Sequence, residues 1–286
     1  MDDYRLIGRL ALTDNVLGGS TPSFSSPTSQ ICGYGQFLDP DFLRWVREMG
    51  LSFEPHRKVW ENAFIAQVAS HAGVLHAGLS AMGFGCGQEP LPSLFANYGM
   101  NVLASDQPQQ GTAAIWAETG EHAESVQSLF HSNIVTQEIF EERVRFRPID
   151  MLDIPDDLAP VDLVWSACTI EHLGTPALGL EFILKSLELL RPGGVAVHTT
   201  EFDLIEREVS LDLGHCAIYQ RKELLDFLDS LDPALFETSI NFWVPMEYPA
   251  DNLVSRPPYS PEEPHLKLIL GPTITTSVGL VIKRVR

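Results

Sequence analysis

The chain has 286 residues, with 38 acidic side chains against 19 basic ones and a formal net charge of −19. This length allows one large domain or two small ones. The hydrophobic fraction of 44% supplies a sizeable core and excludes disorder over most of the chain. Lys and Arg are scarce and scattered, so we expect no binding to nucleic acid or to an anionic membrane surface. Nothing in the sequence indicates an oligomeric state.

The cysteines and the first residues indicate an intracellular protein. The four cysteines lie far apart and form no CxxC pair, which is typical of reduced thiols in a chain of this length. The first residues are acidic where a signal peptide needs bases, so we expect a cytoplasmic location. Residues 62–88 carry no Asp, Glu, Lys or Arg. Their glutamines, serines, histidines and glycines favour a helix followed by a buried strand over a membrane span.

Hydrophobic periodicity predicts alternating strands and helices after a Ser-, Thr-, Gly- and Pro-rich arm over residues 1–35. The expected helices cover 39–50, 57–70, 90–99, 177–190 and 221–231, with further helical stretches inside 111–142. The expected strands cover 75–85, 100–106, 144–150, 161–168, 194–202, 236–245 and 275–285. Residues 191–194, Arg-Pro-Gly-Gly, provide a helix stop and a turn.

This alternation predicts an α/β fold with a doubly wound, mostly parallel sheet of seven strands, covered on both faces. We expect an N-terminal arm and helical lid over 1–73 and the α/β domain over 74–286. The proline-rich segment 245–272 lies between the last two strands, and an insert of this kind usually covers a site. The lid and this insert are expected to form most of a substrate pocket.

A glycine-rich turn follows the first predicted strand of the α/β domain. Its glycines are Gly83, Gly85 and Gly87, and glycines there let the backbone approach a ligand closely. The dinucleotide fingerprint would have Gly or Ala at position 88, where this chain has Gln. A nicotinamide or flavin cofactor is therefore disfavoured, although the pattern leaves it open.

Two acids follow the next two predicted strands. Asp106 ends the strand after the glycine turn, a position from which a carboxylate can accept hydrogen bonds from both hydroxyls of a ribose. Asp150 and Met151 follow the third strand, where a carboxylate can accept the adenine amine and an apolar neighbour can pack on the ring. Each acid has an alternative interpretation as an ordinary turn residue.

The order of these motifs resembles that of the class I S-adenosylmethionine-dependent methyltransferases. The resemblance covers roughly residues 74–286 and rests on GFGCG, LASD, PIDMLDIP, VDLVWSACTIEHLG and LLRPGGVAVHTTEF, together with two late strands that form an antiparallel hairpin in that family. It implies a Rossmann-like fold and S-adenosyl-L-methionine as cofactor. The cofactor-binding residues that it implies are Gly83, Phe84, Gly85, Gly87, Asp106, Gln107, Asp150, Met151, Leu152, Ser166, Ala167 and Trp60.

One position departs from the family pattern. The family usually has an acid two residues before the first motif glycine, and this chain has Ala81 there. That acid commonly orders the loop and the amino end of the ligand, so another group must do so here. The candidates are Glu89 and the helix around His56, Lys58 and Trp60, although each of these is more often structural.

Methyl transfer to a hydroxyl needs a base near the acceptor or a metal that lowers its pKa. Candidate bases gather after the fourth and fifth predicted strands, where parallel strands end at one edge of the sheet. The candidate catalytic residues are Glu171, His172, His198 and His215, with Glu201 close to them in sequence. EHL is also a common helix-starting element in methyltransferases, so a structural role for Glu171 and His172 stays open.

A metal site is a further possibility at this edge. Cys168, Glu171 and His172 have CxxEH spacing, and His215 lies downstream. This is similar to the ExxEH element of metal-supported methyltransferases, namely the small-RNA 2′-O-methyltransferases and, in part, the ubiquinone-pathway O-methyltransferases. The resemblance implies a divalent metal held by these four residues, although a role of Cys168 as a small core residue is the more common one. The low number of bases opposes an RNA substrate.

Three functions follow as hypotheses. The first is an S-adenosylmethionine-dependent methyltransferase acting on a small molecule, with O-methylation of a hydroxylated metabolite favoured. The second is a nucleotide-cofactor oxidoreductase on a Rossmann-like fold, which the glycine turn and Asp106 favour and Gln88 disfavours. The third is a non-catalytic binding protein that retains the fold, which Ala81 favours.

Overall fold

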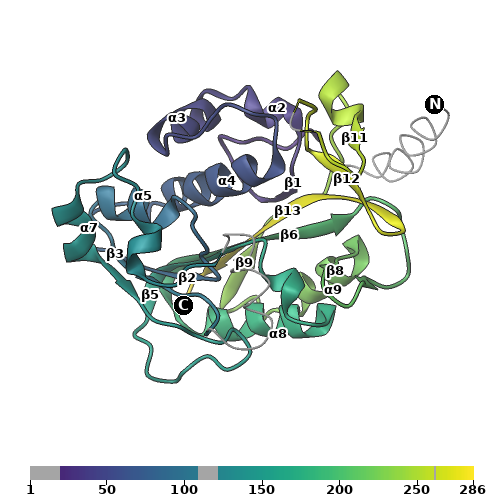
Figure 1. The fold of residues 1–286 in the computed structure, drawn as a ribbon. Coiled ribbons are helices and arrows are strands. Elements are labelled where there is room, and N and C mark those ends of the chain that lie inside the picture. Colours follow the sequence, from purple (N-terminus) through teal and green to yellow (C-terminus); the bar gives the residue numbers. More distant parts are fainter. Residues whose placement is uncertain (1–19, 109–121, 261) are drawn as a thin grey trace.

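The structure is a computed structural model that describes residues 20–108, 122–260 and 262–286. A central sheet lies between helices on its two faces (Figure 1). The helices are α2 (Tyr34–Phe37), α3 (Pro40–Glu48), α4 (Arg57–His71), α5 (Leu91–Asn97), α7 (Gln137–Arg143), α8 (Pro176–Leu187) and α9 (Arg221–Ser230), with 3₁₀ turns η1 (Val126–Leu129), η2 (Ile170–His172) and η3 (Pro249–Asn252). The expected helices at 39–50, 57–70, 90–99, 177–190 and 221–231 are thus present, with shifted ends.

The main sheet contains eleven strands within the described ranges. They are β1 (Ser29–Ile31), β2 (Ser80–Phe84), β3 (Asn101–Ala104), β4 (Val144–Phe146), β5 (Val161–Ala167), β6 (Leu190–Asp203), β9 (Phe236–Thr238), β10 (Ile240–Asn241), β11 (Val254–Ser255), β12 (Lys267–Leu270) and β13 (Thr273–Arg284). A separate small ladder joins β7 (Leu211–Asp212) to β8 (Ala217–Ile218).

The seven expected strands form the frame of this sheet. The parallel part has the order β4-β3-β2-β5-β6, so the chain moves from β2 to one side and then returns to the other. Strand β13 lies antiparallel between β6 and β9. The fold is therefore α/β, Rossmann-like and mostly parallel, as predicted. The direction of winding changes between β2 and β5, and ligands of such sheets bind beside the carboxyl ends of the strands at this point.

The number of strands differs from the prediction because short segments extend the sheet beyond β13. Residues 29–31, expected in a loose arm, instead form β1, which pairs with β13 and β10. The proline-rich segment 245–272 contributes β11 and β12, and β12 pairs with β13. Extended residues at an open sheet edge satisfy their backbone hydrogen bonds by adding a strand. The arm residues 1–19 and part of the helical stretches predicted within 111–142 lie outside the described residues.

Two hydrophobic clusters form the core, one on each face of the sheet. The first packs α3, α4 and α5 against strand residues such as Leu163 and Val197. The second packs α8 and α9 against residues such as Val164 and Ala196. Neighbouring residues in one strand thus face opposite clusters, as strand geometry requires. Helix α4 is buried along most of its length and forms a layer of this core, although the sequence suggested a lid.

Short local signals begin several helices. Asp39 accepts the backbone N–H of Asp41 at the start of α3, and Thr175 does the same for Leu178 at the start of α8. Pro40 and Pro176 occupy the first turn in each case, where proline costs no hydrogen bond. Helix α4 has a less common cap, since the His56 ring accepts the N–H of Lys58. This cap fixes the backbone next to Arg57, whose side chain enters the site.

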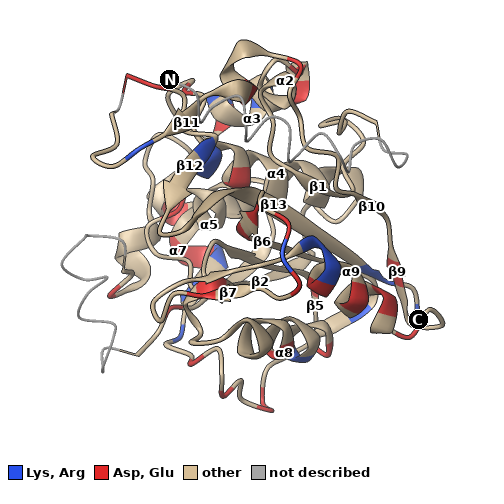
Figure 2. Ribbon diagram, turned by 90° about the vertical axis from the view of Figure 1, so that its right-hand side faces the viewer, with Lys and Arg blue, Asp and Glu red and all other residues tan. Residues whose placement is uncertain are grey.

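No helix of the described residues is long and apolar enough to cross a membrane. Residues 62–88 form most of α4, a turn and β2, as predicted. Figure 2 shows the Lys and Arg positions lying apart on several elements among more numerous Asp and Glu positions. All four cysteines are buried and free of disulfide bonds.

Candidate active site

The glycine turn after β2 is built around backbone conformations that favour glycine. Gly85 and Gly87 have φ values of +59° and +52°, in the left-handed region where other residues are strained. Gly83 serves a different purpose, because a Cβ at this position would lie 2.3 Å from the Trp165 ring. The first motif glycine therefore makes room for an indole. Phe84 is buried and packs edge-on against Phe182, towards the α8 layer.

Asp106 holds the turn in place. Its carboxylate accepts the backbone N–H groups of Gly87 at 3.1 Å, Ala123 at 2.8 Å and Gln107 at 2.8 Å. These bonds tie the end of β3 to the glycine turn. Asp106 thus lies beside the turn, as the predicted ribose position requires, and part of its hydrogen-bonding capacity is used by the protein.

Two buried polar atoms near this turn have no hydrogen-bond partner among the described residues. One is Thr169 Oγ1 and the other is His122 Nδ1. The Thr169 side chain lies against Gly85, and His122 Nε2 is 2.8 Å from the carbonyl oxygen of Gln107. Unsatisfied buried polar atoms are costly unless a ligand or water completes them. The turn and its surroundings therefore fit a polar ligand such as a nucleoside-containing cofactor.

The other predicted cofactor residues are not all beside the turn. Asp150 is exposed and accepts the N–H of Leu152 at 2.9 Å, while Met151 is buried. Ala167 is half-buried at the end of β5. Trp60 is fully buried, donates to Gln36 at 2.8 Å and stacks on Phe64. Trp60 is therefore part of the core contacts between α4 and α2.

The structure places His198 and Ser166 inside the protein. The His198 ring lies 2.8 Å from the Ser166 hydroxyl and 3.1 Å from the Ser186 hydroxyl, and all three residues are fully buried. Burial lowers the pKa of His198 to about 3. The ring is thus neutral and buried under α8, so neither the catalytic role predicted for His198 nor the cofactor-binding role predicted for the Ser166 side chain fits its surroundings.

A group of charged and polar side chains, buried except for the exposed Lys58, lies at the carboxyl ends of β5 and β6, and we call it the ionic cluster. Its members are Arg57, Lys58, Glu61, Cys168, Glu171, Glu201 and Ser277. Cys168 has a φ of +48°, an uncommon value for a residue with a side chain. Such strained positions concentrate at functional sites.

Arg57 lies at the centre of the ionic cluster. Its Nη1 pairs with the carboxylate of Glu201, lies 3.5 Å from Glu61 Oε1 and 3.3 Å from Ser277 Oγ, and lies 3.7 Å from Cys168 Sγ. Burial opposes the charge, but the carboxylates, Glu201 first, raise the pKa of Arg57 above its usual range. Arg57 therefore stays charged in a largely dry environment.

Glu171 is the cluster acid that is best placed to carry a proton. Its carboxyl group is buried and accepts the Thr200 hydroxyl at 3.0 Å. Burial raises the pKa of Glu171, and the nearby Glu201 carboxylate raises it further, while His172 and Lys58 act in the opposite direction. With Glu171 protonated, the carboxylates of Glu61 and Glu201 balance the charges of Arg57 and Lys58.

The predicted metal set is only partly brought together. Ligand atoms of Cys168, Glu171 and Glu201 lie within 4.8 Å of one another. His172 and His215 are outside this group, and His172 Nδ1 lies 2.7 Å from the backbone oxygen of His215. The Cys168 thiol donates to Glu61 at 3.0 Å, and burial raises its pKa. Because the guanidinium of Arg57 pairs with Glu201 and lies 3.7 Å from Cys168 Sγ, a positive charge already occupies this place, and the donor set does not fit a divalent metal.

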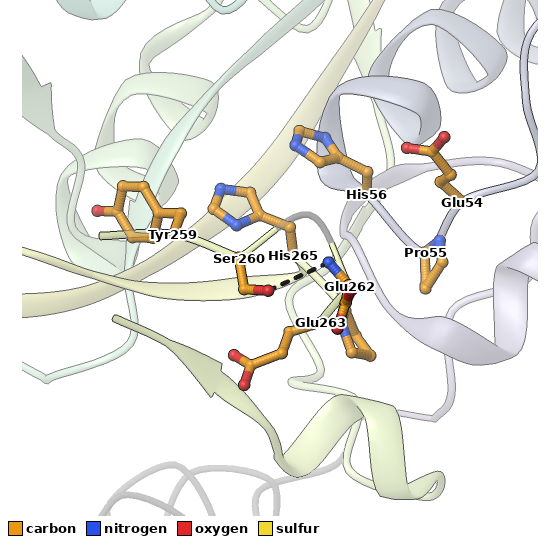
Figure 3. A pocket seen from close by; sticks show the side chains of 9 residues that line it. Glu54, Pro55, His56, Tyr259, Ser260, Glu262, Glu263 and His265 are labelled. Carbon is orange, nitrogen blue, oxygen red and sulfur yellow. Dashed lines mark hydrogen bonds between the residues drawn. The ribbon is translucent and has the colours of Figure 1, made fainter. Parts of the chain in front are cut away.

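A cavity of about 560 Å³ lies between residues 54–56 on one side and residues 259–260 and 262–265 on the other. The rings of His56 and His265 stack in it with centroids 4.6 Å apart, and Tyr259 meets His265 edge-on (Figure 3). Burial lowers the pKa of His56 to about 4 and also lowers that of His265. The predicted lid and the predicted insert thus line one cavity together. Arg57, the next residue after His56, links this region to the ionic cluster.

Sequence reasoning did not select Arg57, Glu61 or Ser277 as site residues. They lie on α4 and β13, far in sequence from the motifs that follow β5 and β6. One signal was available, since Arg57 and Glu61 are an i, i+4 ion pair on a helix that is otherwise mostly apolar. Buried charges of this kind need partners, which here come from the sheet.

No protein-family model matches the chain, and no curated protein matches it. Solved structures do match it. An O-methyltransferase from a polyketide synthase multienzyme of Brevibacillus brevis, in complex with S-adenosyl-L-homocysteine, has 13% identity and a TM-score of 0.38, covering 52% of this chain and 44% of that one. A TehB-like S-adenosylmethionine-dependent methyltransferase from Corynebacterium glutamicum has 15% identity and a TM-score of 0.41, covering 83% and 93%.

TehB from Haemophilus influenzae has 12% identity and a TM-score of 0.43, covering 77% of this chain and 62% of that one. The matches to the first four solved structures cover 48%, 44%, 61% and 48% of those chains, which is about half of their length. Since identities and TM-scores are low, the fold is assigned from its own strand order. That order, with β13 antiparallel between β6 and β9, is the one expected from the resemblance to class I methyltransferases.

Proposed function

We propose that the chain is an S-adenosylmethionine-dependent methyltransferase that methylates a hydroxyl group of a small molecule. The observation that carries this proposal is the position of the glycine turn and Asp106 at the change of winding between β2 and β5. In the same sheet, the last strand of the chain, β13, runs antiparallel to β6. A nucleotide-cofactor oxidoreductase would share the turn and the acid. The antiparallel last strand favours the methyltransferase.

The cofactor would lie along the glycine turn. Gly85 and Gly87 would let the backbone approach its methionine part, and Asp106 would accept hydrogen bonds from the ribose. Thr169 Oγ1 and His122 Nδ1 supply buried polar atoms that have no partner among the described residues. Asp150 and Met151, which follow β4, would contact the adenine. S-adenosylmethionine, when bound, supplies a methyl group on a positively charged sulfur, which is already an activated electrophile.

The acceptor would enter through the cavity lined by residues 54–56, 259–260 and 262–265 and place its hydroxyl near the ionic cluster. There the ionised form of Glu171, its carboxylate, would accept the hydroxyl proton. A base with a pKa raised towards the working pH suits this role, because its carboxylate is then basic enough to take the proton. The largely buried surroundings would exclude water. No metal is assigned a step, since the donor set of Cys168, Glu171 and Glu201 does not fit one.

Binding of the cofactor is the direct test. Calorimetry with S-adenosylmethionine and S-adenosylhomocysteine should give one site per chain for each. An absence of binding to both would disprove the proposed function. A titration with NADH provides the comparison, and tight NADH binding in its place would favour the oxidoreductase.

The role of Glu171 needs an acceptor screen. With an acceptor found among small hydroxylated compounds, Glu171→Gln should lower kcat by about 100-fold or more and leave cofactor affinity unchanged. The exposed Glu181→Gln on α8 is the matched control and should retain activity. Cofactor binding without transfer to any acceptor would favour the non-catalytic binding protein.

A further inference from the structure

The methionine end of the proposed cofactor site lacks its usual acid. Ala81, in β2, is buried and stands where related methyltransferases have a carboxylate. The cofactor carries an ammonium group at this end, and a buried ammonium needs hydrogen-bond acceptors and a counter-charge. Another side chain near the glycine turn must supply them.

Glu89 lies directly after the glycine turn and is partly buried. Its Oε1 accepts the Trp165 indole N–H at 2.6 Å, and its backbone N–H donates to the Cys86 oxygen at 3.1 Å. The Trp165 ring in turn packs over Gly83. The carboxylate is therefore held at a fixed place beside the turn by a residue of β5.

The side chains around Glu89 include other acids, and among the described residues no basic side chain balances the charge of Glu89. No Lys, Arg or His forms an ion pair with Glu89 in the part of the chain that the structure describes. The pKa of Glu89 is raised to about 8, first by burial and then by the carboxylates of Asp106 and Glu61, against the hydrogen bonds from Trp165 and Cys86. Glu89 is thus influenced both by the predicted ribose acid and by the ionic cluster. A cation bound here would relieve the repulsion between these acids.

The other candidates for this role are already engaged. Lys58 is itself a cation and lies 3.5 Å from Glu61 Oε2. The Trp60 indole donates to Gln36, and the His56 ring accepts the N–H of Lys58. None of these side chains offers an unshared negative charge to an ammonium.

We propose that Glu89 replaces the acid missing at Ala81 and binds the α-ammonium group of S-adenosylmethionine. This inference rests on the proposed function and adds the residue that recognises the amino-acid end of the cofactor. Trp165 acts as a positioning residue, because its N–H fixes one oxygen of the carboxylate, Oε1.

Three ligands separate this role from a general effect on the turn. S-adenosylmethionine and S-adenosylhomocysteine carry the ammonium, whereas 5′-methylthioadenosine lacks the amino-acid part and keeps the adenosine. In Glu89→Gln, calorimetry should show affinities for the first two weakened by about 10- to 100-fold, as expected for loss of a charge-assisted hydrogen bond. The affinity for 5′-methylthioadenosine should stay within about twofold of wild type, which also demonstrates that the variant is folded.

Glu138→Gln is the matched control, since this exposed residue at the start of α7 undergoes the same change of charge. It should leave all three affinities unchanged. Equal weakening of all three ligands in Glu89→Gln would overturn the inference, and so would unchanged binding of S-adenosylmethionine. Failure of the proposed function is distinguishable, because the wild-type protein would then bind none of the three ligands.

Discussion

Arg57, at the start of α4, forms an ion pair with Glu201 in β6, and the two side chains are only 9% and 4% exposed. The pair joins the helical layer to the sheet at the edge where β5 and β6 end. An intact buried pair adds little net stability, because both charges had to leave water. Loss of one partner is costly, since the remaining charge stays buried.

Arg57→Met should therefore lower the free energy of unfolding by about 3–5 kcal/mol. The double variant Arg57→Met with Glu201→Gln should be less destabilised than the single variant, because the uncompensated carboxylate is gone. Urea unfolding followed by circular dichroism measures both. The control is Arg44→Met, which breaks exposed pairs with Asp41 and Glu48 and should cost no more than about 1 kcal/mol. A double variant less stable than Arg57→Met would contradict this account of the pair.

The purified protein should contain well under one equivalent of zinc, manganese or other divalent metal. The reason is that the positive charge of Arg57 already occupies the position beside Glu201 and Cys168. Elemental analysis by mass spectrometry gives the metal content, and treatment with EDTA should leave the melting temperature unchanged. One bound equivalent, with a lower melting temperature after chelation, would restore the metal site predicted from the CxxEH spacing.

His198 should make the protein less stable in mild acid. The pKa of His198 is about 3 in the folded protein, against 6.5 for an ordinary histidine. Between these values the unfolded chain binds a proton that the folded chain does not. The contribution of His198 to the free energy of unfolding is therefore fully present above pH 6.5. As the pH decreases below 6.5, this contribution falls by about 1.4 kcal/mol per pH unit.

His198→Gln should remove this contribution. Between pH 7 and pH 5 the free energy of unfolding of this variant should fall by about 2 kcal/mol less than that of wild type. The exposed His71→Gln is the control and should retain the wild-type dependence. Parallel pH profiles for wild type and His198→Gln would show that His198 does not stay neutral when buried.

Gly83→Ala should destabilise the protein through Trp165. The added Cβ would lie 2.3 Å from the indole and 2.5 Å from Cys86 Sγ, and overpacking of this kind costs about 1–3 kcal/mol. Trp165→Phe removes the ring atoms that clash. In a double-mutant cycle, Gly83→Ala should therefore lower the free energy of unfolding less in the Trp165→Phe background than in wild type. If the two changes had additive effects on the free energy of unfolding, the added Cβ would not be clashing with Trp165.

The frame of the fold follows from the sequence because its signals are local. The segment VDLVWSAC predicted a strand over 161–168, and β5 covers Val161–Ala167; the helix predicted over 177–190 became α8, Pro176–Leu187. Runs of β-branched residues between turn signals and apolar residues at helical spacing determine these elements without distant contacts. The strand β1 has only three residues, and it forms because β13 and β10 lie beside it. No local pattern carries that information.

The sequence predicted the parts of the candidate site that depend on backbone conformation. It did not predict the parts that depend on the direction in which a side chain points. The glycine turn and Asp106 lie together, as their positions after β2 and β3 suggested. His198 was chosen for its chemistry, but strand alternation directs it towards α8, together with Ser166. Arg57 and Glu61 were missed because their partners come from β5, β6 and β13, and sequence spacing does not connect α4 to those strands.

The pairing of β1 also affects the order in which the molecule is completed. Its partners are residues 240–241 and 278–279, so more than two hundred residues separate the two sides of this contact. During synthesis from the N-terminus, β1 must wait until β13 has been made, and contacts of such long sequence separation form slowly. Until then the sheet beyond β6 has an open edge, which makes the partly made chain most vulnerable to aggregation at this stage.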